Sequence, residues 1–178
     1  MVILKGTGVS EGIAFGRIFI NKPKSSKSEK REIKDANEEI NRYKKAKKAT
    51  LDYTKKLYNQ ILETLGENEA EIFKAHEMMI NDPDFENSII NIISEEMANA
   101  EYAILKTSET FSKIFLDMPD PYMKSRAMDV TDISNCMINE LLGKNSEENF
   151  GGLKGNVILV SEDFTPSEIT SANKEKVA

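Results

Sequence analysis

Apolar and polar positions follow different periods along the chain, and the changes of period divide it into three parts. Residues 2–8 and 13–20 are short β-branched runs separated by glycines, which predicts two strands joined by a tight turn. From residue 29 to residue 143 apolar residues recur at steps of three and four, the spacing of helices. After a polar stretch, the continuous apolar run Val157–Val160 predicts a buried strand.

The longest helix is predicted over residues 29–65, where no glycine or proline interrupts the chain. Its N-cap is expected near Ser28, and Gly66 should end it as a C-cap glycine. At 1.5 Å per residue this helix would reach roughly 50 Å, so several other helices must cover its apolar stripe.

A bent pair of helices is predicted next. The first must stop before Pro83, where Asp82 becomes the N-cap of the second. The apolar face of the first helix consists of Ile72, Phe73, His76, Met79 and Ile80. The second is expected to bury Phe85, Ile89, Ile92 and Ile93. The bend is therefore built into the sequence.

Two further long helices and one short helix complete the pattern. Asn99 is the predicted cap of the first, and Asp120-Pro121 starts the second, which runs to Gly143. Thr165-Pro166 starts the short helix, which runs towards Asn173. The apolar candidates of the helix after Asn99 are Tyr102, Leu105, Phe111, Ile114 and Phe115. Four helical arms with short connections predict an antiparallel bundle.

The order strand, helices, strand predicts an α+β fold. We expect an α/β domain made of residues 1–21 and 144–178, interrupted by a helical bundle over residues 22–143. Three strands and one helix would leave a sheet face and an edge uncovered. The chain is therefore expected to be cut short, with an incomplete α/β domain.

Composition narrows the classes of partner. The chain has 178 residues and a formal net charge of −6, which argues against nucleic acid and favours a small basic protein. The basic run over residues 22–31 could be a nucleic-acid or membrane patch. It has no aromatic residue for base stacking, and acids follow it, so a connector is favoured.

Cysteine usage and hydropathy indicate a cytosolic protein. The single Cys136 excludes a disulfide framework and a structural zinc site, so a reducing compartment is the simpler reading. No apolar run approaches the ~20 residues of a membrane span. We expect no membrane insertion and a cytoplasmic location.

One motif matches an enzyme signature. Gly8-Val9-Ser10-Glu11-Gly12 fits the G-x-S-x-G pattern of serine hydrolases, which requires a strand-to-helix elbow and a histidine base. Strands are predicted on both sides, so a turn between strands is favoured. Metal binding is not expected, because one histidine and one cysteine need two supporting carboxylates to hold zinc.

The corner between the bent helices is the strongest candidate for recognition. Met78 lies beside Met79, and adjacent helix residues diverge by about 100°, so only one of the two faces the core. The acids Asp82, Asp84 and Glu86 frame the corner. Adaptable thioethers with an acidic rim suit a partner that is basic at its edge. His76 is either a phosphoacceptor or a half-buried helix residue, and the second reading is favoured because no cation lies near it.

Four segments together resemble the amino-terminal half of Enzyme I, the phosphoenolpyruvate-protein phosphotransferase of the bacterial sugar phosphotransferase system. They are KGTGVSEGIAFGRIFI, EAEIFKAHEMMINDPDF, MKSRAMDVTDISNCMINELLG and NVILVSEDFTPSE. The resemblance spans the whole chain. It implies a swivelling phosphohistidine α/β domain with an inserted helical bundle that docks HPr, a small basic phosphocarrier.

The same resemblance implies which functions this chain lacks. In the family the phosphorylated histidine follows the TPSE helix in a Gly-Gly-x-x-Ser-His segment, which is expected beyond Ala178. The carboxy-terminal barrel, which binds phosphoenolpyruvate and magnesium and forms a homodimer, is not represented either. We therefore expect no catalytic residue and no cofactor in this chain, and an inactive fragment of a transferase.

The resemblance also implies a set of HPr-docking residues. They are Glu67, His76, Met78, Met79, Asp82, Asp84, Phe85, Phe115, Tyr122, Met123 and Arg126. Arg126 could instead form a helix-surface ion pair with Asp129. The alternative to an enzyme fragment is a stand-alone helical interaction module, but such a module would not carry the strand sequence VILV after its bundle.

Overall fold

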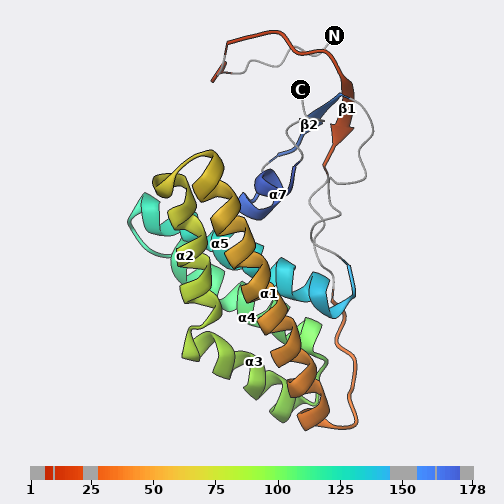
Figure 1. Cartoon of the computed structure of the whole chain (residues 1–178). Coiled ribbons are helices and arrows are strands. Elements are labelled where there is room, and N and C mark those ends of the chain that lie inside the picture. Colours follow the sequence, from red (N-terminus) through yellow and green to blue (C-terminus); the bar gives the residue numbers. More distant parts are fainter. Residues whose placement is uncertain (1–6, 10, 22–27, 145–155, 163, 173–178) are drawn as a thin grey trace, which may run out of the picture.

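The computed structural model describes residues 7–9, 11–21, 28–144, 156–162 and 164–172. Within these ranges the protein is mostly helical, with a small parallel sheet at one end of the molecule (Figure 1). No helix in the described part of the chain is long and apolar enough to cross a membrane.

The longest helix, α1, covers Ala36–Thr64. Its N-cap is Asp35, whose carboxylate accepts the backbone N–H groups of Asn37 at 2.8 Å and Glu38 at 3.2 Å. Gly66 ends the helix as predicted: its φ of +107° lies in the region that favours glycine, and its N–H donates to the Ile61 carbonyl.

The predicted start of α1 near Ser28 is wrong. The residues before α1 use their backbone groups to pair with the chain between α3 and α4. Ile33 donates its N–H to the Met97 carbonyl at 2.9 Å, and Glu32 forms an antiparallel bridge with Ala98. This extended pairing holds the segment out of the helix.

The bent pair is present as predicted. Helix α2 covers Glu67–Ile80, and α3 covers Pro83–Glu96. The Asp82 carboxylate accepts the backbone N–H groups of Asp84 at 2.9 Å and Phe85 at 3.0 Å. Asp82 and Pro83 therefore stop one helix and start the next.

Helices α4 (Ala100–Leu116) and α5 (Pro121–Leu141) form the closest helix pair. The Ser112 hydroxyl of α4 donates to the Ala127 carbonyl of α5 at 3.2 Å, a contact that requires the backbones to approach closely. As predicted, Asp120 caps α5, accepting the Tyr122 N–H at 2.8 Å.

The predicted buried face of α4 is wrong in detail. Small and polar side chains fill the interface, because large ones would separate the two backbones. The larger predicted residues lie at its flanks, partly buried, and Ile114 is exposed. The buried residues of α4 are Ala100, Glu101, Ala103, Ile104, Thr107 and Ser108.

Helices α1 to α5 share one apolar core. A smaller cluster joins the ends of α1 and α2, through Leu57 and Ile61 on one helix and Ala70 and Phe73 on the other. The buried residues of the main cluster are Tyr43, Ile80, Phe85, Ile89, Ile93, Ala100, Ala103, Ile104, Val130, Ile133, Met137 and Ile138.

Two strands form the sheet within the part of the chain that the structure describes. β1 (Arg17–Ile20) pairs in parallel with β2 (Val157–Val160), with Arg17 opposite Val157. The expectation that residues 157–160 pair with the first strands, and not with the helices, is confirmed. The expected full burial of β2 is wrong: Val157 is buried, but Val160 is 44% exposed, because two strands cannot cover both faces of a sheet.

The sequence pattern overestimated the amount of strand near the amino end. The run over residues 13–20 is strand only from Arg17, and residues 2–6 lie outside the described residues. Ser10 of the hydrolase-like motif also lies outside them. Residues 11–16 form no helix, so the elbow which that motif requires is not seen there.

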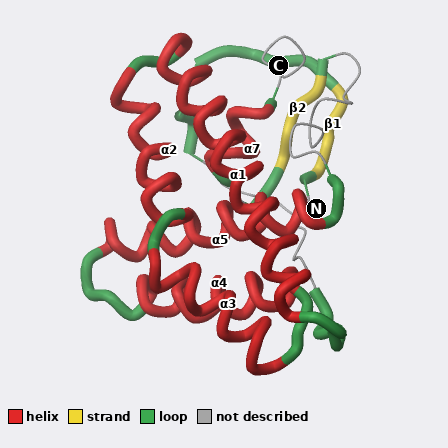
Figure 2. Tube along the Cα trace, turned by 60° about the horizontal axis from the view of Figure 1, so that its bottom comes forward, coloured by secondary structure: helices red, strands yellow, loops and turns green. Residues whose placement is uncertain are grey.

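Helix α7 (Pro166–Ser171) lies between the long helices and the strands (Figure 2). Thr165 and Glu168 form the predicted capping box at its start. The helix contacts α1 and α5, and the Ser167 N–H donates to the Asp132 carboxylate of α5 at 3.1 Å. Asp132 thus ties α7 to the long helices.

Candidate docking site

The two methionines of the predicted site differ in exposure. Met78 is 75% exposed, whereas Met79 is partly buried against the main core. One methionine therefore faces solvent at the end of α2, next to the α2–α3 corner. Met79 anchors the helix beneath it.

The acids at this corner differ in what they can offer a partner. Asp84 is exposed, while the Asp82 carboxylate accepts the N–H groups that start α3. Glu86 pairs with Lys47 of α1 at 2.7 Å. Among these three acids, Asp84 is the one with the most accessible charge.

Phe85 is not available to a partner, although it was predicted as a docking residue. Its side chain is 2% exposed and meets the edge of Phe111 with ring centroids 5.2 Å apart. As the second residue after Pro83, it points back into the core that α3 shares with α4. Its contribution is to hold the corner in place.

His76 is likewise buried, at 1% exposed, so its predicted half-buried place in the docking surface is wrong. Helix α5 covers this side of α2. The imidazole Nε2 lies 3.4 Å from Oδ1 of Asp129, and the ring meets Phe73 edge to face. A side chain in this position cannot touch a protein partner directly.

The remaining predicted residues lie around the α4–α5 connection, on the same side of the molecule as α2 (Figure 1). Phe115 and Met123 are partly buried, and Phe115 packs against the core cluster that also contains Met79. Tyr122 is 62% exposed. Of these three side chains, Tyr122 is the one that is largely exposed.

Arg126 forms the ion pair that its spacing from Asp129 predicts. Its Nη1 lies 2.8 Å from Oδ2 of Asp129. The guanidinium also hydrogen-bonds the Tyr122 hydroxyl and lies over the Tyr122 ring, 4.5 Å from its centroid. Burial alone would raise the pKa of Asp129, but its contacts with His76 and Arg126 outweigh burial and lower it.

Glu67 lies at the other end of α2 from these acids. Fifteen residues separate it from Asp82, a distance of about 22 Å along a helix. Its exposed carboxylate is 4.0 Å from Lys74, which also contacts Glu71 and lies over the Tyr58 ring. The predicted acids therefore mark two ends of a surface.

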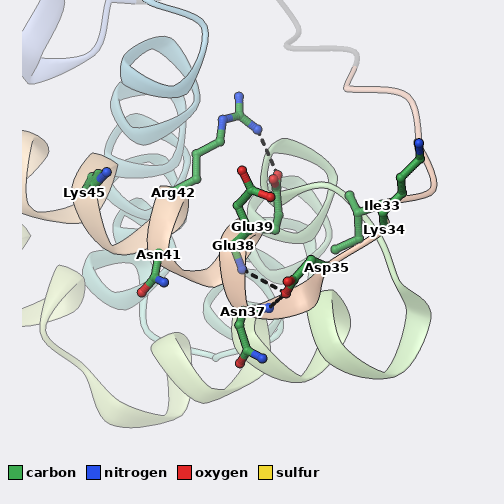
Figure 3. Close-up of a pocket in the computed structure, with 9 residues that line it drawn as sticks. All are labelled: Ile33, Lys34, Asp35, Asn37, Glu38, Glu39, Asn41, Arg42 and Lys45. Carbon is green, nitrogen blue, oxygen red and sulfur yellow. Dashed lines mark hydrogen bonds and ion pairs between the residues drawn. The ribbon is translucent and has the colours of Figure 1, made fainter.

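A hollow of about 820 Å³ beside the first turns of α1 contains none of the predicted residues (Figure 3). Two of its charged groups pair within the protein: Arg42 lies 2.8 Å from Glu39 and also binds Glu101. The hollow is lined by Ile33, Lys34, Asp35, Asn37, Glu38, Glu39, Asn41, Arg42 and Lys45.

The sequence analysis missed two buried acids of α5, of which only Asp129 belongs to the site. Asp129 pairs with Arg126 and lies 3.4 Å from His76, whereas Asp132 ties α5 to α7 outside the site. The signal was present in the spacing: Arg126, Asp129 and Asp132 follow one another at steps of three, which places them along one side of a helix. Apolar neighbours such as Val130 and Ile133 obscured this stripe.

Comparisons with known proteins agree with the sequence resemblance. A family model described as PEP-utilising enzyme, N-terminal, matches residues 5–126. Over 174 residues the chain is 33% identical to the phosphoenolpyruvate-protein phosphotransferase of Mycoplasma capricolum subsp. capricolum and 34% identical to that of Bacillus subtilis. Each match covers 98% of this chain and 30% of the relative, so the chain spans about 30% of the length of these relatives.

Solved structures point the same way. A solution structure of Enzyme I (nEIt) superposes with a TM-score of 0.74 at 31% identity, covering 94% of this chain and 68% of that one. The N-terminal domain of "Enzyme 1 - Nitrogen" superposes with a TM-score of 0.69 at 16% identity, a likeness of fold alone. This chain therefore belongs to the family of PEP-utilising enzyme N-terminal regions, and within it to the N-terminal part of Enzyme I.

Proposed function

We propose that this chain is the HPr-docking part of a phosphoenolpyruvate-protein phosphotransferase. That enzyme moves phosphate from phosphoenolpyruvate through a histidine to HPr, for sugar uptake in the cytosol. The observation that carries the docking role is the exposed Met78, which lies next to the corner that bears the exposed acid Asp84. Family membership disfavours the alternative of a stand-alone interaction module.

The proposed architecture has two parts. Residues 22–143 form an antiparallel helical bundle that carries the docking surface, inserted into an α/β phosphohistidine domain that contains residues 1–21 and 144–178. Two observations support this division. Helices α1 to α5 share one core, and β1 pairs in parallel with β2 although the whole helical region separates them in sequence.

The phosphotransfer chemistry is assigned to parts of the relatives that this chain does not match. His76 is buried and its Nε2 faces Asp129, so it has no access to a phosphoryl donor. In the part of the chain that the structure describes, no three His, Cys, Asp or Glu residues are placed to hold a metal ion. As the family resemblance implies, we propose that phosphoenolpyruvate, magnesium and the homodimer contact belong to other parts of the parent enzyme.

The structure refines which residues could touch HPr. We propose direct contact for the accessible members, with His76 and Phe85 acting only as support from within. A phosphocarrier must leave after each transfer, so the interface should bury no more than about 1,200 Å² in total. The proposed contact residues are Glu67, Met78, Met79, Asp82, Asp84, Phe115, Tyr122, Met123 and Arg126.

Titration of the chain with HPr from Bacillus subtilis, followed by HPr amide shifts, tests the docking role. The wild-type chain should shift HPr signals, and Met78→Ser should weaken binding about tenfold, as for an exposed apolar anchor. The matched control is Leu142→Ser. This exposed leucine lies next to the other end of α5, about 30 Å from Tyr122 by helix length.

A charge variant tests the acidic rim. Asp84→Lys should slow association with a basic partner, and the difference should shrink in high salt. Asp52→Lys on α1 makes the same change of net charge at an exposed site outside the surface. Unchanged HPr shifts at high wild-type concentration would contradict the docking function itself.

A further inference from the structure

A chain of contacts runs from the proposed docking surface into the protein interior. It begins at the exposed Tyr122, passes through Arg126 and Asp129, and ends at the buried His76. Three of these residues lie on α5 and the fourth lies on α2. The contacts therefore connect an exposed side chain of α5 to a buried side chain of α2.

Asp129 occupies the centre of this chain and uses its two oxygens for different partners. Oδ2 lies 2.8 Å from Nη1 of Arg126, and Oδ1 lies 3.4 Å from Nε2 of His76. The carboxylate is almost fully buried, so it cannot swing towards solvent. His76 of α2 lies on one side of the carboxylate, and Arg126 lies on the other.

Arg126 is consequently fixed on three sides. Asp129 binds Nη1, the Tyr122 hydroxyl binds Nη2, and the Tyr122 ring lies under the guanidinium. A guanidinium has five N–H donors, and these two bonds leave further donors for a partner's carbonyl oxygens. An arginine that is already ordered loses less conformational freedom when a partner binds.

Charge provides a second reason for this arrangement. A free arginine at the docking surface would repel the basic rim of HPr. The Asp129 carboxylate neutralises it, so Arg126 can act as a hydrogen-bond donor without adding net positive charge. The acidic character of the surface, carried by Asp84, is preserved.

We propose that Asp129 is a positioning residue of the docking surface, which orders and neutralises Arg126 while His76 packs against its other oxygen. This role rests on the docking function proposed above. Asp129 does not touch the partner. It acts through Arg126, and its effect on binding should therefore vanish when Arg126 is absent.

A double-mutant cycle on the full chain tests this dependence, with HPr affinity measured by titration calorimetry. Asp129→Asn and Arg126→Gln should each weaken binding several-fold, up to about tenfold. The double variant should bind no more weakly than Arg126→Gln alone. If Asp129 were merely structural, its loss would weaken binding equally with or without Arg126, and that additivity would overturn the role.

Asp132→Asn is the matched control. Asp132 is also a buried acid of α5, one turn further along, but it binds the Ser167 N–H of α7 and not Arg126. Its replacement should leave HPr affinity and the Arg126 coupling unchanged. An equal loss of affinity in this variant would show that removing any buried acid of α5 weakens HPr binding. That result would contradict a specific role of Asp129.

The mobility of the Arg126 side chain can be measured in the wild-type chain, so this test does not depend on whether the variants fold. Nitrogen relaxation of the Arg126 Nε–H in the free protein should show an ordered side chain, and a freely mobile one would overturn the positioning role. The outcomes also separate the two proposals. A wild-type chain that does not bind HPr contradicts both, whereas normal HPr binding by folded Asp129→Asn contradicts the positioning role alone.

Discussion

Glu101 is a buried acid that stays ionised in the folded protein. It is buried at the start of α4, where its carboxylate binds Arg42 of α1, accepts the Asn99 side-chain N–H at 2.9 Å and lies 3.4 Å from Arg31. Burial alone would raise the pKa of Glu101, but the hydrogen bonds from Arg42 and Asn99 outweigh it and lower the pKa from 4.5 to about 2. The ionised form is therefore part of the folded structure.

Replacing Glu101 by Gln should reduce the free energy of unfolding at pH 7 by up to the order of 3 kcal/mol, because a lowered pKa stabilises the folded state. This contribution is fully present above pH 4.5 and is lost as the pH falls towards 2. Urea denaturation at pH 7 and at pH 3 measures it: the difference between wild type and Glu101→Gln should shrink at the lower pH.

The control for this variant is Glu96→Gln, which removes an exposed ion pair with Lys30. Such surface pairs contribute at most about 1 kcal/mol, so this variant should differ little from wild type at either pH. A Glu101→Gln variant as stable as Glu96→Gln would contradict the stabilising role of the buried carboxylate.

At the scale of single elements, local signals predicted most helix boundaries. An acid or threonine followed by proline starts α3, α5 and α7, and this pattern needs no information from the rest of the chain. The start of α1 was not predictable in this way. Residues 29–35 are kept extended by the bridge between Glu32 and Ala98, which are far apart in sequence.

Two substitutions distinguish the predicted cap of α1 from the observed one. Asp35→Ala should lower the free energy of unfolding by about 1 kcal/mol, because two N–H groups of the first turn lose their acceptor. Ser28→Ala should change it by less than about 0.5 kcal/mol. Urea titration measures both, and equal effects would contradict the assignment of Asp35 as the cap.

The contrast between local signals and contacts between distant residues also explains which site residues could be predicted. The exposure of Met78 follows from the apolar stripe of α2, which fixes Met79 inside. Helix periodicity also placed His76 on the apolar face of α2 and Phe85 on that of α3, and the family resemblance was what assigned both to the docking surface. How completely α5 and α4 cover them is information that one helix period does not contain. The pairing of His76 with Asp129 joins residues 53 positions apart, so spacing along α5 could suggest only the Arg126 contact.

At the scale of the whole molecule, the helices share an apolar core, whereas the short sheet leaves several apolar side chains exposed. Ile18 is 69% exposed and Ile20 is 62% exposed, in a sheet that has two strands among the described residues. Exposed apolar side chains on short parallel strands favour pairing with another chain. The end of the molecule that carries the sheet therefore exposes an apolar surface that favours association.

We expect the chain to self-associate through this sheet. Sedimentation velocity over a wide concentration range should show reversible oligomers, and Ile18→Lys should reduce them. Ile114→Lys, at an exposed apolar position on α4, should leave association unchanged. A wild-type chain that remains monomeric at every concentration would contradict this expectation.

The contact between α7 and α5 has a practical consequence for following the protein's motion. Cys136, the single cysteine of the sequence, is buried on α5 with its Sγ 3.8 Å from the Ser167 hydroxyl of α7. Burial raises the pKa of this thiol, so a thiol reagent in solution reacts only after α7 has moved away from Cys136. The rate at which Cys136 is modified therefore reports how often α7 separates from α5. Asp132→Asn, which removes the contact with the Ser167 N–H, should raise that rate.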